Sequence, residues 1–167
     1  MRAFWIAVLC AMLAACAGTT EQDGAGVEDR KPGTEARGAD GGKPDSSPLT
    51  DPSSVLSKRS VFYDYDKYDV KPEYRPLVEA HAKYLRENRT MKVLIQGNTD
   101  ERGSREYNIA LGQRRADGVK RMLILLGATE IQVESVSLGE EKPRAQGTDE
   151  AAFSQNRRSD ILYQGEY

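Results

Sequence analysis

The chain has little of the chemistry on which most enzymes and nucleic-acid-binding proteins depend. Its 167 residues include two cysteines and one histidine, and its net charge is −2. No long run of Lys or Arg supplies the basic footprint that binding to nucleic-acid phosphates requires. A single histidine leaves metal ligation and Ser-His-Asp catalysis without the partners that they need. We therefore expect no nucleic-acid partner, no metal, no cofactor and no catalytic residues.

Long hydrophobic runs are also missing, apart from one near the N-terminus. Residues 3–12 are almost wholly apolar and follow Arg2. About ten residues are too few to cross a bilayer of roughly 30 Å as a helix, but they match the core of a signal peptide. The sequence Leu13-Ala14-Ala15-Cys16 then resembles the bacterial lipobox, which implies removal of residues 1–15 and lipidation of Cys16. The alternative is an ordinary signal peptide followed by a chance cysteine.

A long polar segment comes next. It is rich in Gly, Pro, Asp, Ser and Thr and has almost no large apolar side chains. Such a segment cannot bury enough surface to offset the entropy lost on ordering it. We predict a lipidated cysteine and flexible periplasmic tether over residues 16–57, and a folded domain over residues 58–167. Because Cys10 lies in the removed segment, only Cys16 would remain and no internal disulfide could form.

The remaining sequence alternates between strand-like and helix-like periodicity. Strands are expected at residues 61–66, 93–97, 131–138 and 159–163, and helices at 72–88, 104–126 and 149–155. Pro72 suits a helix start, Ser104 a helix cap and Gly127 a helix end. The order β-α-β-α-β-α-β predicts a two-layer α/β sandwich, with helices packed on one face of a mixed four-stranded sheet.

Each long helix is expected to bury one face. On the first helix this face carries Leu77, Val78, His81, Ala82 and Leu85. On the second helix it carries Ile109, Ala116, Val119, Met122, Leu123 and Leu126. We therefore interpret His81 as a packed or capping histidine.

The second helix and the turn before it carry one carboxylate and one guanidinium of particular interest. Asp100 lies just before the helix, and Asn108, Leu111 and Arg115 share one stripe at positions i, i+3 and i+7. Arginine binds a carboxylate through two parallel hydrogen bonds, and an aspartate offers a fixed anion to an ammonium. Together they would match the end group of an amino acid. Alternatively, Asp100 is only a turn residue and Arg115 only a solvated helix position.

This stretch resembles the core signature of the OmpA-like peptidoglycan-binding domain, and within that family most closely the peptidoglycan-associated lipoproteins. The matching sequences are G-N-T-D-E-R-G at residues 97–103 and E-Y-N-I-A-L-G-Q-R-R-A at residues 106–116. Further agreement comes from F-Y-D-Y-D-K-Y-D-V at 62–70, G-E-E-K-P at 139–143 and D-E-A-A-F at 149–153. The resemblance covers nearly all of residues 61–163 in order.

The resemblance implies an outer-membrane lipoprotein whose domain faces the periplasm and binds peptidoglycan without breaking a bond. The implied ligand is the meso-diaminopimelate of the stem peptide, with Asp100 on its ammonium and Arg115 on its carboxylate. The other implied site residues are Tyr65, Asp66 and Tyr68 on the opposite wall, and Thr99, Asn108 and Leu111. Membership of the Tol–Pal system is implied as well, with the propeller protein TolB as a partner and a role in envelope integrity and cell division.

Two other functions stay open from the sequence. One is an OmpA-like envelope lipoprotein outside the Tol–Pal system. The other is a cell-wall hydrolase, for which Asp64, Asp66 and Asp69 would be the candidate acid and base. Arg157 and Arg158 could bind an anion, or could pin the short third helix to the sheet or to a neighbouring carboxylate.

Overall fold

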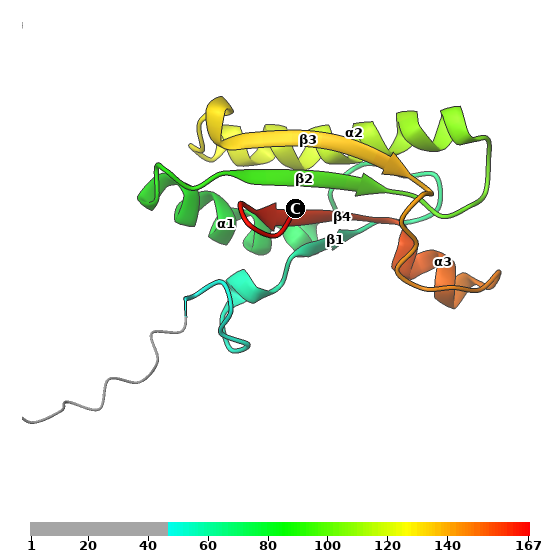
Figure 1. Cartoon of the computed structure of the whole chain (residues 1–167), viewed down its shortest axis with the longest axis horizontal. Helices are drawn as coiled ribbons and strands as arrows, with labels where there is room; N and C mark the ends of the chain where they lie inside the picture. The colour runs from blue at the N-terminus through cyan, green and yellow to red at the C-terminus, as the bar shows by residue number, and fades with distance from the viewer. Residues whose placement is uncertain (1–46) are drawn as a thin grey trace, which may run out of the picture. The chain divides into compact units, whose positions relative to one another are not determined.

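The computed structural model describes residues 47–167 (Figure 1). The expected signal peptide, Cys16 and most of the expected tether lie outside the described residues. Within the described part, no helix is both long enough and apolar enough to cross a bilayer.

The secondary structure follows the predicted order. The strands are β1 (Ser60–Phe62), β2 (Val93–Asn98), β3 (Val133–Gly139) and β4 (Arg158–Tyr163), and the helices are α1 (Arg75–Glu87), α2 (Arg105–Leu125) and α3 (Glu150–Asn156). Three short 3-10 helices lie at Val55–Ser57, Pro72–Tyr74 and Glu130–Gln132.

The four strands form one mixed sheet in the order β1-β4-β2-β3. β2 runs parallel to β3, whereas β4 is antiparallel to both β1 and β2. Figure 1 shows α1 and α2 on one face of this sheet, and α3 at the end where β2 and β3 terminate. The predicted two-layer α/β sandwich is confirmed.

The core lies between the sheet and the two long helices. Its fully buried side chains include Val61, Ile95 and Ile161 from the strands and Val119 and Leu123 from α2. Burial of these apolar surfaces is the main stabilising contribution to the fold.

Two apolar residues were predicted wrongly, Ile109 as part of the buried face of α2 and Ile131 as the first residue of the third strand. Ile109 is 39% exposed and Ile131 is 79% exposed. Ile131 lies in the 3-10 turn before β3, so it never joins the strand pattern. Ile109 is displaced because the first half of α2 turns the stripe of Asn108, Leu111 and Arg115 inward instead.

Two glycines allow α2 to lie directly against the sheet. A Cβ atom on Gly97 of β2 would lie 1.8 Å from the carbonyl oxygen of Gly112 on α2. Only two residues without side chains can approach so closely. This contact places the polar stripe of α2 over the end of β2, where the candidate site forms.

His81 is a packed residue, as predicted. It is fully buried, with Nε2 2.9 Å from the Lys58 carbonyl and Nδ1 2.9 Å from the Tyr163 hydroxyl. A carbonyl can only accept, so Nε2 carries the proton and Nδ1 accepts from Tyr163. Burial lowers the pKa of His81 to about 4, which keeps the ring neutral at physiological pH.

The folded contacts begin before the expected domain start at Lys58. Leu49 packs against the core. The Arg59 side chain donates to the carbonyls of Leu49 and Leu56 at 2.9 and 2.7 Å. These bonds hold part of the expected tether against the domain.

Candidate functional site

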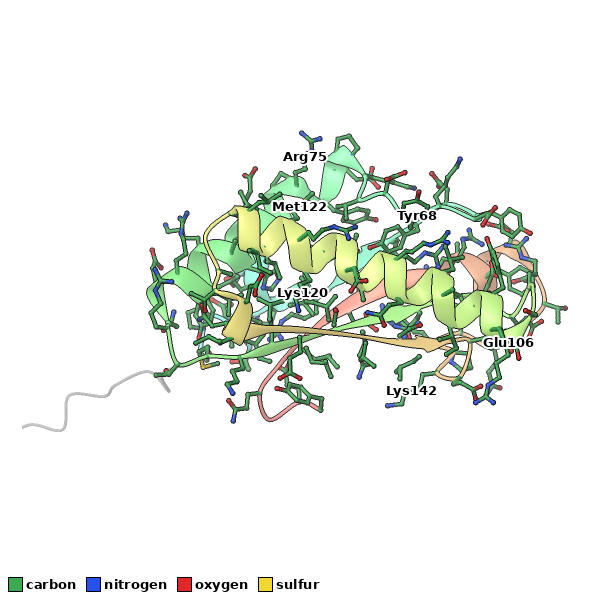
Figure 2. The ribbon with its side chains drawn as sticks, turned by 90° about the horizontal axis from the view of Figure 1, so that it is seen from above. Tyr68, Arg75, Glu106, Lys120, Met122 and Lys142 are labelled. Carbon is green, nitrogen blue, oxygen red and sulfur yellow. The ribbon has the colours of Figure 1, made fainter. Side chains whose placement is uncertain are left out.

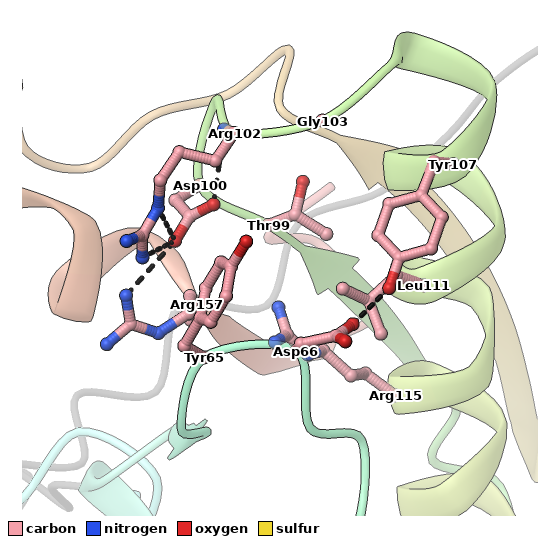
Figure 3. Close-up of a pocket in the computed structure, with 10 residues that line it drawn as sticks. All are labelled: Tyr65, Asp66, Thr99, Asp100, Arg102, Gly103, Tyr107, Leu111, Arg115 and Arg157. Carbon is pink, nitrogen blue, oxygen red and sulfur yellow. Dashed lines mark hydrogen bonds and ion pairs between the residues drawn. The ribbon is translucent and has the colours of Figure 1, made fainter.

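A cavity of about 320 Å³ lies at the end of β2 (Figure 3). Four segments meet there: the loop after β1, the turn before α2, the first turns of α2, and the junction of α3 with β4. Its lining residues are Tyr65, Asp66, Thr99, Asp100, Arg102, Gly103, Tyr107, Leu111, Arg115 and Arg157. Six of the eight predicted site residues therefore line one cavity.

Arg115 is fully buried and supports the loop after β1. Its Nε donates to the Lys67 carbonyl at 2.8 Å, Nη1 to the Asn98 carbonyl at 2.8 Å, and Nη2 to the Asp64 carbonyl at 3.4 Å. These bonds also explain why β1 ends at Phe62, before the predicted Asp66. The alternative of a solvated Arg115 is excluded.

All three acceptors of Arg115 are neutral. Among residues 47–167 no carboxylate forms a salt bridge with its guanidinium, and three hydrogen bonds leave two of five N–H groups without a protein acceptor. Burial lowers the pKa of Arg115 to about 10, so it is still a cation at neutral pH. A buried cation facing a cavity without a counter-ion is rare in proteins and favours an anionic ligand.

Asp100 lies on the other side of the cavity and is only 4% exposed. Its Oδ2 accepts from Nε and Nη2 of Arg102 at 3.2 and 2.6 Å and from Nη1 of Arg157 at 3.0 Å. Oδ1 accepts only the backbone N–H of Arg102, at 3.2 Å. Burial opposes ionisation, but these hydrogen bonds outweigh it and hold the pKa of Asp100 below its usual value.

The loop after β1 forms the opposite wall. Asp66 has a φ of 57°, an uncommon conformation for a residue other than glycine, and it accepts a hydrogen bond from the Tyr107 hydroxyl. The Tyr65 ring lies 4.1 Å from the guanidinium carbon of Arg102. The wall is therefore held in place by side chains from α2 and from the turn before it.

The remaining predicted residues divide into two groups. Thr99 and Leu111 line the cavity, and the buried Thr99 hydroxyl has no hydrogen-bond partner within the described part of the chain. Asn108 does not line it, although it is buried and donates to Glu140. Tyr68 does not line it either.

Tyr68 faces a separate groove further along α2. It lies beside the middle of the helix, away from the N-terminal end that Glu106 marks (Figure 2). The groove also contains Gly118 and Arg121. A role for Tyr68 at the site is still a prediction.

Three cavity residues were missed by sequence reasoning, Arg102, Gly103 and Tyr107, whereas Arg157 was considered as an anion-binding residue or a structural one. Gly103 has a φ of 113°, which only glycine adopts readily, and it turns the chain into the Ser104 cap of α2. Arg157 bridges Asp100 and Glu150, so the alternative of pinning α3 to a neighbouring carboxylate is the correct one. Arg102 stands two positions after Asp100, which is the signal that could have identified it.

The arrangement can hold a small zwitterion. Arg115 and Asp100 line the same cavity, together with the apolar Leu111 side chain. Within residues 47–167, two N–H groups of Arg115 and the Thr99 hydroxyl have no hydrogen-bond partner, and Oδ1 of Asp100 accepts one hydrogen bond. Within residues 47–167, no cluster of three or more His, Cys, Asp or Glu side chains is placed to hold a metal ion.

The fold and this cavity define a small α/β binding domain, and comparison with known proteins assigns it to a family. Residues 62–157 match the model of the OmpA family. The chain belongs to the OmpA family.

Curated relatives of this chain are described as peptidoglycan-associated lipoproteins. The peptidoglycan-associated lipoprotein of Pasteurella multocida is 52% identical over 104 residues, which span 62% of this chain and 69% of the relative. That of Pseudomonas putida is 45% identical over 124 residues, which span 74% of each chain. The crystal structure of the peptidoglycan-associated lipoprotein from Burkholderia pseudomallei has 56% identity and a TM-score of 0.70, and it covers 71% of this chain and 100% of that one. The match therefore extends over the whole of that crystallised chain, so in this relative the matched region is a folded unit.

Proposed function

We propose that this protein binds peptidoglycan non-covalently, through the meso-diaminopimelate residue of the stem peptide. The observation that carries the proposal is the buried Arg115, whose charge has no carboxylate partner within residues 47–167 and whose side chain lines the cavity. The names of the relatives point to the same polymer.

Each end of the ligand has a complementary group. The side-chain carboxylate of diaminopimelate would take the two remaining N–H groups of Arg115 in a bidentate hydrogen bond. Its ammonium would bind Oδ1 of Asp100, which accepts only one backbone N–H. Thr99 would offer its unpaired hydroxyl, and Leu111 would contact the methylene groups. No bond is broken in this scheme, so the protein is a binding module and not an enzyme.

The proposed anchor lies in the N-terminal segment. Residues 1–15 would be removed as a signal peptide, and Cys16 would carry the lipid that holds the protein in the outer membrane. Several acyl chains at about 0.8 kcal/mol per buried methylene make such an anchor firm. Residues 16–57 would link the anchor to the periplasmic domain at residues 58–167, so that binding the cell wall couples it to the membrane.

A matched pair of peptides tests the ligand. Stem peptides with either diaminopimelate or lysine at the third position are titrated into residues 47–167 by calorimetry. Lysine lacks the terminal carboxylate, so only the diaminopimelate peptide can engage Arg115. We expect clear binding of the diaminopimelate peptide alone; equal affinity for the two peptides would reject the assignment.

We further propose that the protein acts in the Tol–Pal system and binds TolB on a surface that overlaps the loop at Asp66 and the turn at Asp100. This would link it to envelope integrity and cell division. Pull-down of purified TolB by the folded domain tests the partner. Failure of that pull-down, together with retained peptide binding, would favour an OmpA-like envelope lipoprotein outside the Tol–Pal system.

A further inference from the structure

Arg102 holds the carboxylate on which the proposed ligand depends. Its guanidinium donates twice to Oδ2 of Asp100, at 3.2 and 2.6 Å. Figure 3 shows this pair among the side chains that line the cavity. A cation of the protein itself thus sits on the carboxylate that would receive the ligand's ammonium.

The two arginines on Asp100 differ in how easily they can move. The Arg157 side chain is 6% exposed and also donates to the Tyr63 carbonyl and to Glu150, which fixes it within the fold. The Arg102 side chain is 34% exposed. Arg102 is therefore the partner that can leave Asp100.

Other groups near Arg102 can stabilise its guanidinium if it leaves Asp100. Its Nη2 lies 3.4 Å from Glu150, whose side chain is 65% exposed. Its guanidinium carbon lies 4.1 Å from the Tyr65 ring and 4.4 Å from the Phe153 ring. Stacking between two aromatic faces stabilises a guanidinium without requiring a carboxylate. Arg102 can shift toward Glu150 and keep these contacts.

We propose that Arg102 is a specificity-determining residue, which competes with the ligand's ammonium for Asp100 and so limits how strongly the site favours a ligand with an ammonium over one that lacks it. A ligand with an ammonium alone must displace Arg102 from Asp100 or share this carboxylate with it. Such a ligand has no carboxylate that could bind Arg115. A zwitterion adds the bond between its carboxylate and Arg115, which compensates for the weakened pair. Arg102 therefore lowers the affinity of the site for every ligand that carries the distal ammonium, the zwitterion included.

Three stem peptides isolate the two charges. They carry diaminopimelate, 2-aminopimelate (which lacks the distal ammonium) or lysine (which lacks the distal carboxylate) at the third position. Affinities are measured by calorimetry for residues 47–167 as wild type, Arg102→Gln and Arg89→Gln. Arg89 is an exposed arginine at the opposite end of β2 and serves as the matched control.

In Arg102→Gln, we expect the affinity ratio of diaminopimelate to 2-aminopimelate peptide to rise about threefold or more, as removal of a partly exposed competing ion pair would give. The ratio of diaminopimelate to lysine peptide should not change, because it reports Arg115. Arg89→Gln should alter neither ratio. A fall in the first ratio would mean that Arg102 positions Asp100, and an unchanged ratio would mean that it plays no part; either result overturns the inference.

The inference rests on the proposed function, and the design separates their failures. If the wild-type protein does not distinguish diaminopimelate from lysine, the proposed function fails. If it does, and Arg102→Gln gives no rise, only the role of Arg102 fails. Should Arg102→Gln not fold by circular dichroism, Arg102→Lys provides the test, because it keeps the charge but cannot donate in a fork to Asp100. A smaller rise in the first ratio is then expected, and its absence would count against the proposal.

Discussion

The titration of His81 should make the stability of the domain fall as the pH drops below neutrality. Burial lowers the pKa of this ring from 6.5 to about 4 in the folded protein. At pH 7.5 the ring is neutral in both states. As the pH falls through 6.5, His81 becomes protonated in the unfolded chain but stays neutral in the folded protein. The free energy of unfolding therefore decreases. The loss stops once the pH is below about 4.

The size of the effect follows from the shift in pKa. Each unit corresponds to about 1.4 kcal/mol, so the full loss is about 3 kcal/mol, and the interval from pH 7.5 to 5.5 accounts for about 1 kcal/mol. With a urea m value of about 1–3 kcal/mol per molar, the unfolding midpoint should move down by roughly 0.3–1 M over this interval. Carboxylates titrate in the unfolded chain near pH 4 and contribute little here.

Urea unfolding of residues 47–167, followed by far-ultraviolet circular dichroism at pH 7.5, 6.5 and 5.5, measures this dependence. His81 is the only histidine in the sequence, so His81→Gln removes every imidazole. Glutamine retains a donor for the Lys58 carbonyl and does not titrate. We expect a midpoint that depends on pH in the wild type and not in the variant. The same slope in both proteins, or no slope in the wild type, would refute the reasoning.

Three further predictions concern the site, the packing and the anchor. Asp100→Ala and Arg115→Lys should each weaken binding of the diaminopimelate peptide by about 2–5 kcal/mol in calorimetry, because the first removes the carboxylate and the second the bidentate guanidinium from a desolvated site. Wild-type affinity in both variants would remove these residues from the site. Gly97→Ala should destabilise the domain by about 3 kcal/mol or more in urea unfolding, because its Cβ would lie 1.8 Å from a carbonyl oxygen of α2. Gly118→Ala is the control on α2: its Cβ would meet one atom at 3.6 Å, and the change should stabilise the domain by about 0.5–1 kcal/mol. Cys16→Ser should leave the full-length protein out of the outer-membrane fraction, and unchanged fractionation would contradict lipidation.

The order of the helices and strands could be predicted because periodicity, capping and turn chemistry act locally. The Ser104 cap, the start at Pro72 and the burial of the Leu77–Leu85 face were all readable in this way. Ile109 could not be placed, because the rotation of α2 depends on the close approach of two glycines from different elements. Local patterns carry no information about such a contact.

The features of the site also separate into those that are local in the sequence and those that depend on tertiary contacts. The stripe of Asn108, Leu111 and Arg115 and the position of Asp100 before the helix are properties of one continuous segment, so both could be read from the sequence, whereas the structure places Asp100 and Arg115 at one cavity. The resemblance of this segment to a known signature was enough to propose their ligand.

Only the tertiary structure decided how the charges are satisfied. Arg115 is buried without a carboxylate because three carbonyls, from the loop after β1 and from the end of β2, surround it. Asp100 is held by Arg157, which is 57 residues away in the chain, and shared with Arg102. Ion pairing depends on distance in space, and the segments involved meet only when the sheet and α3 have formed.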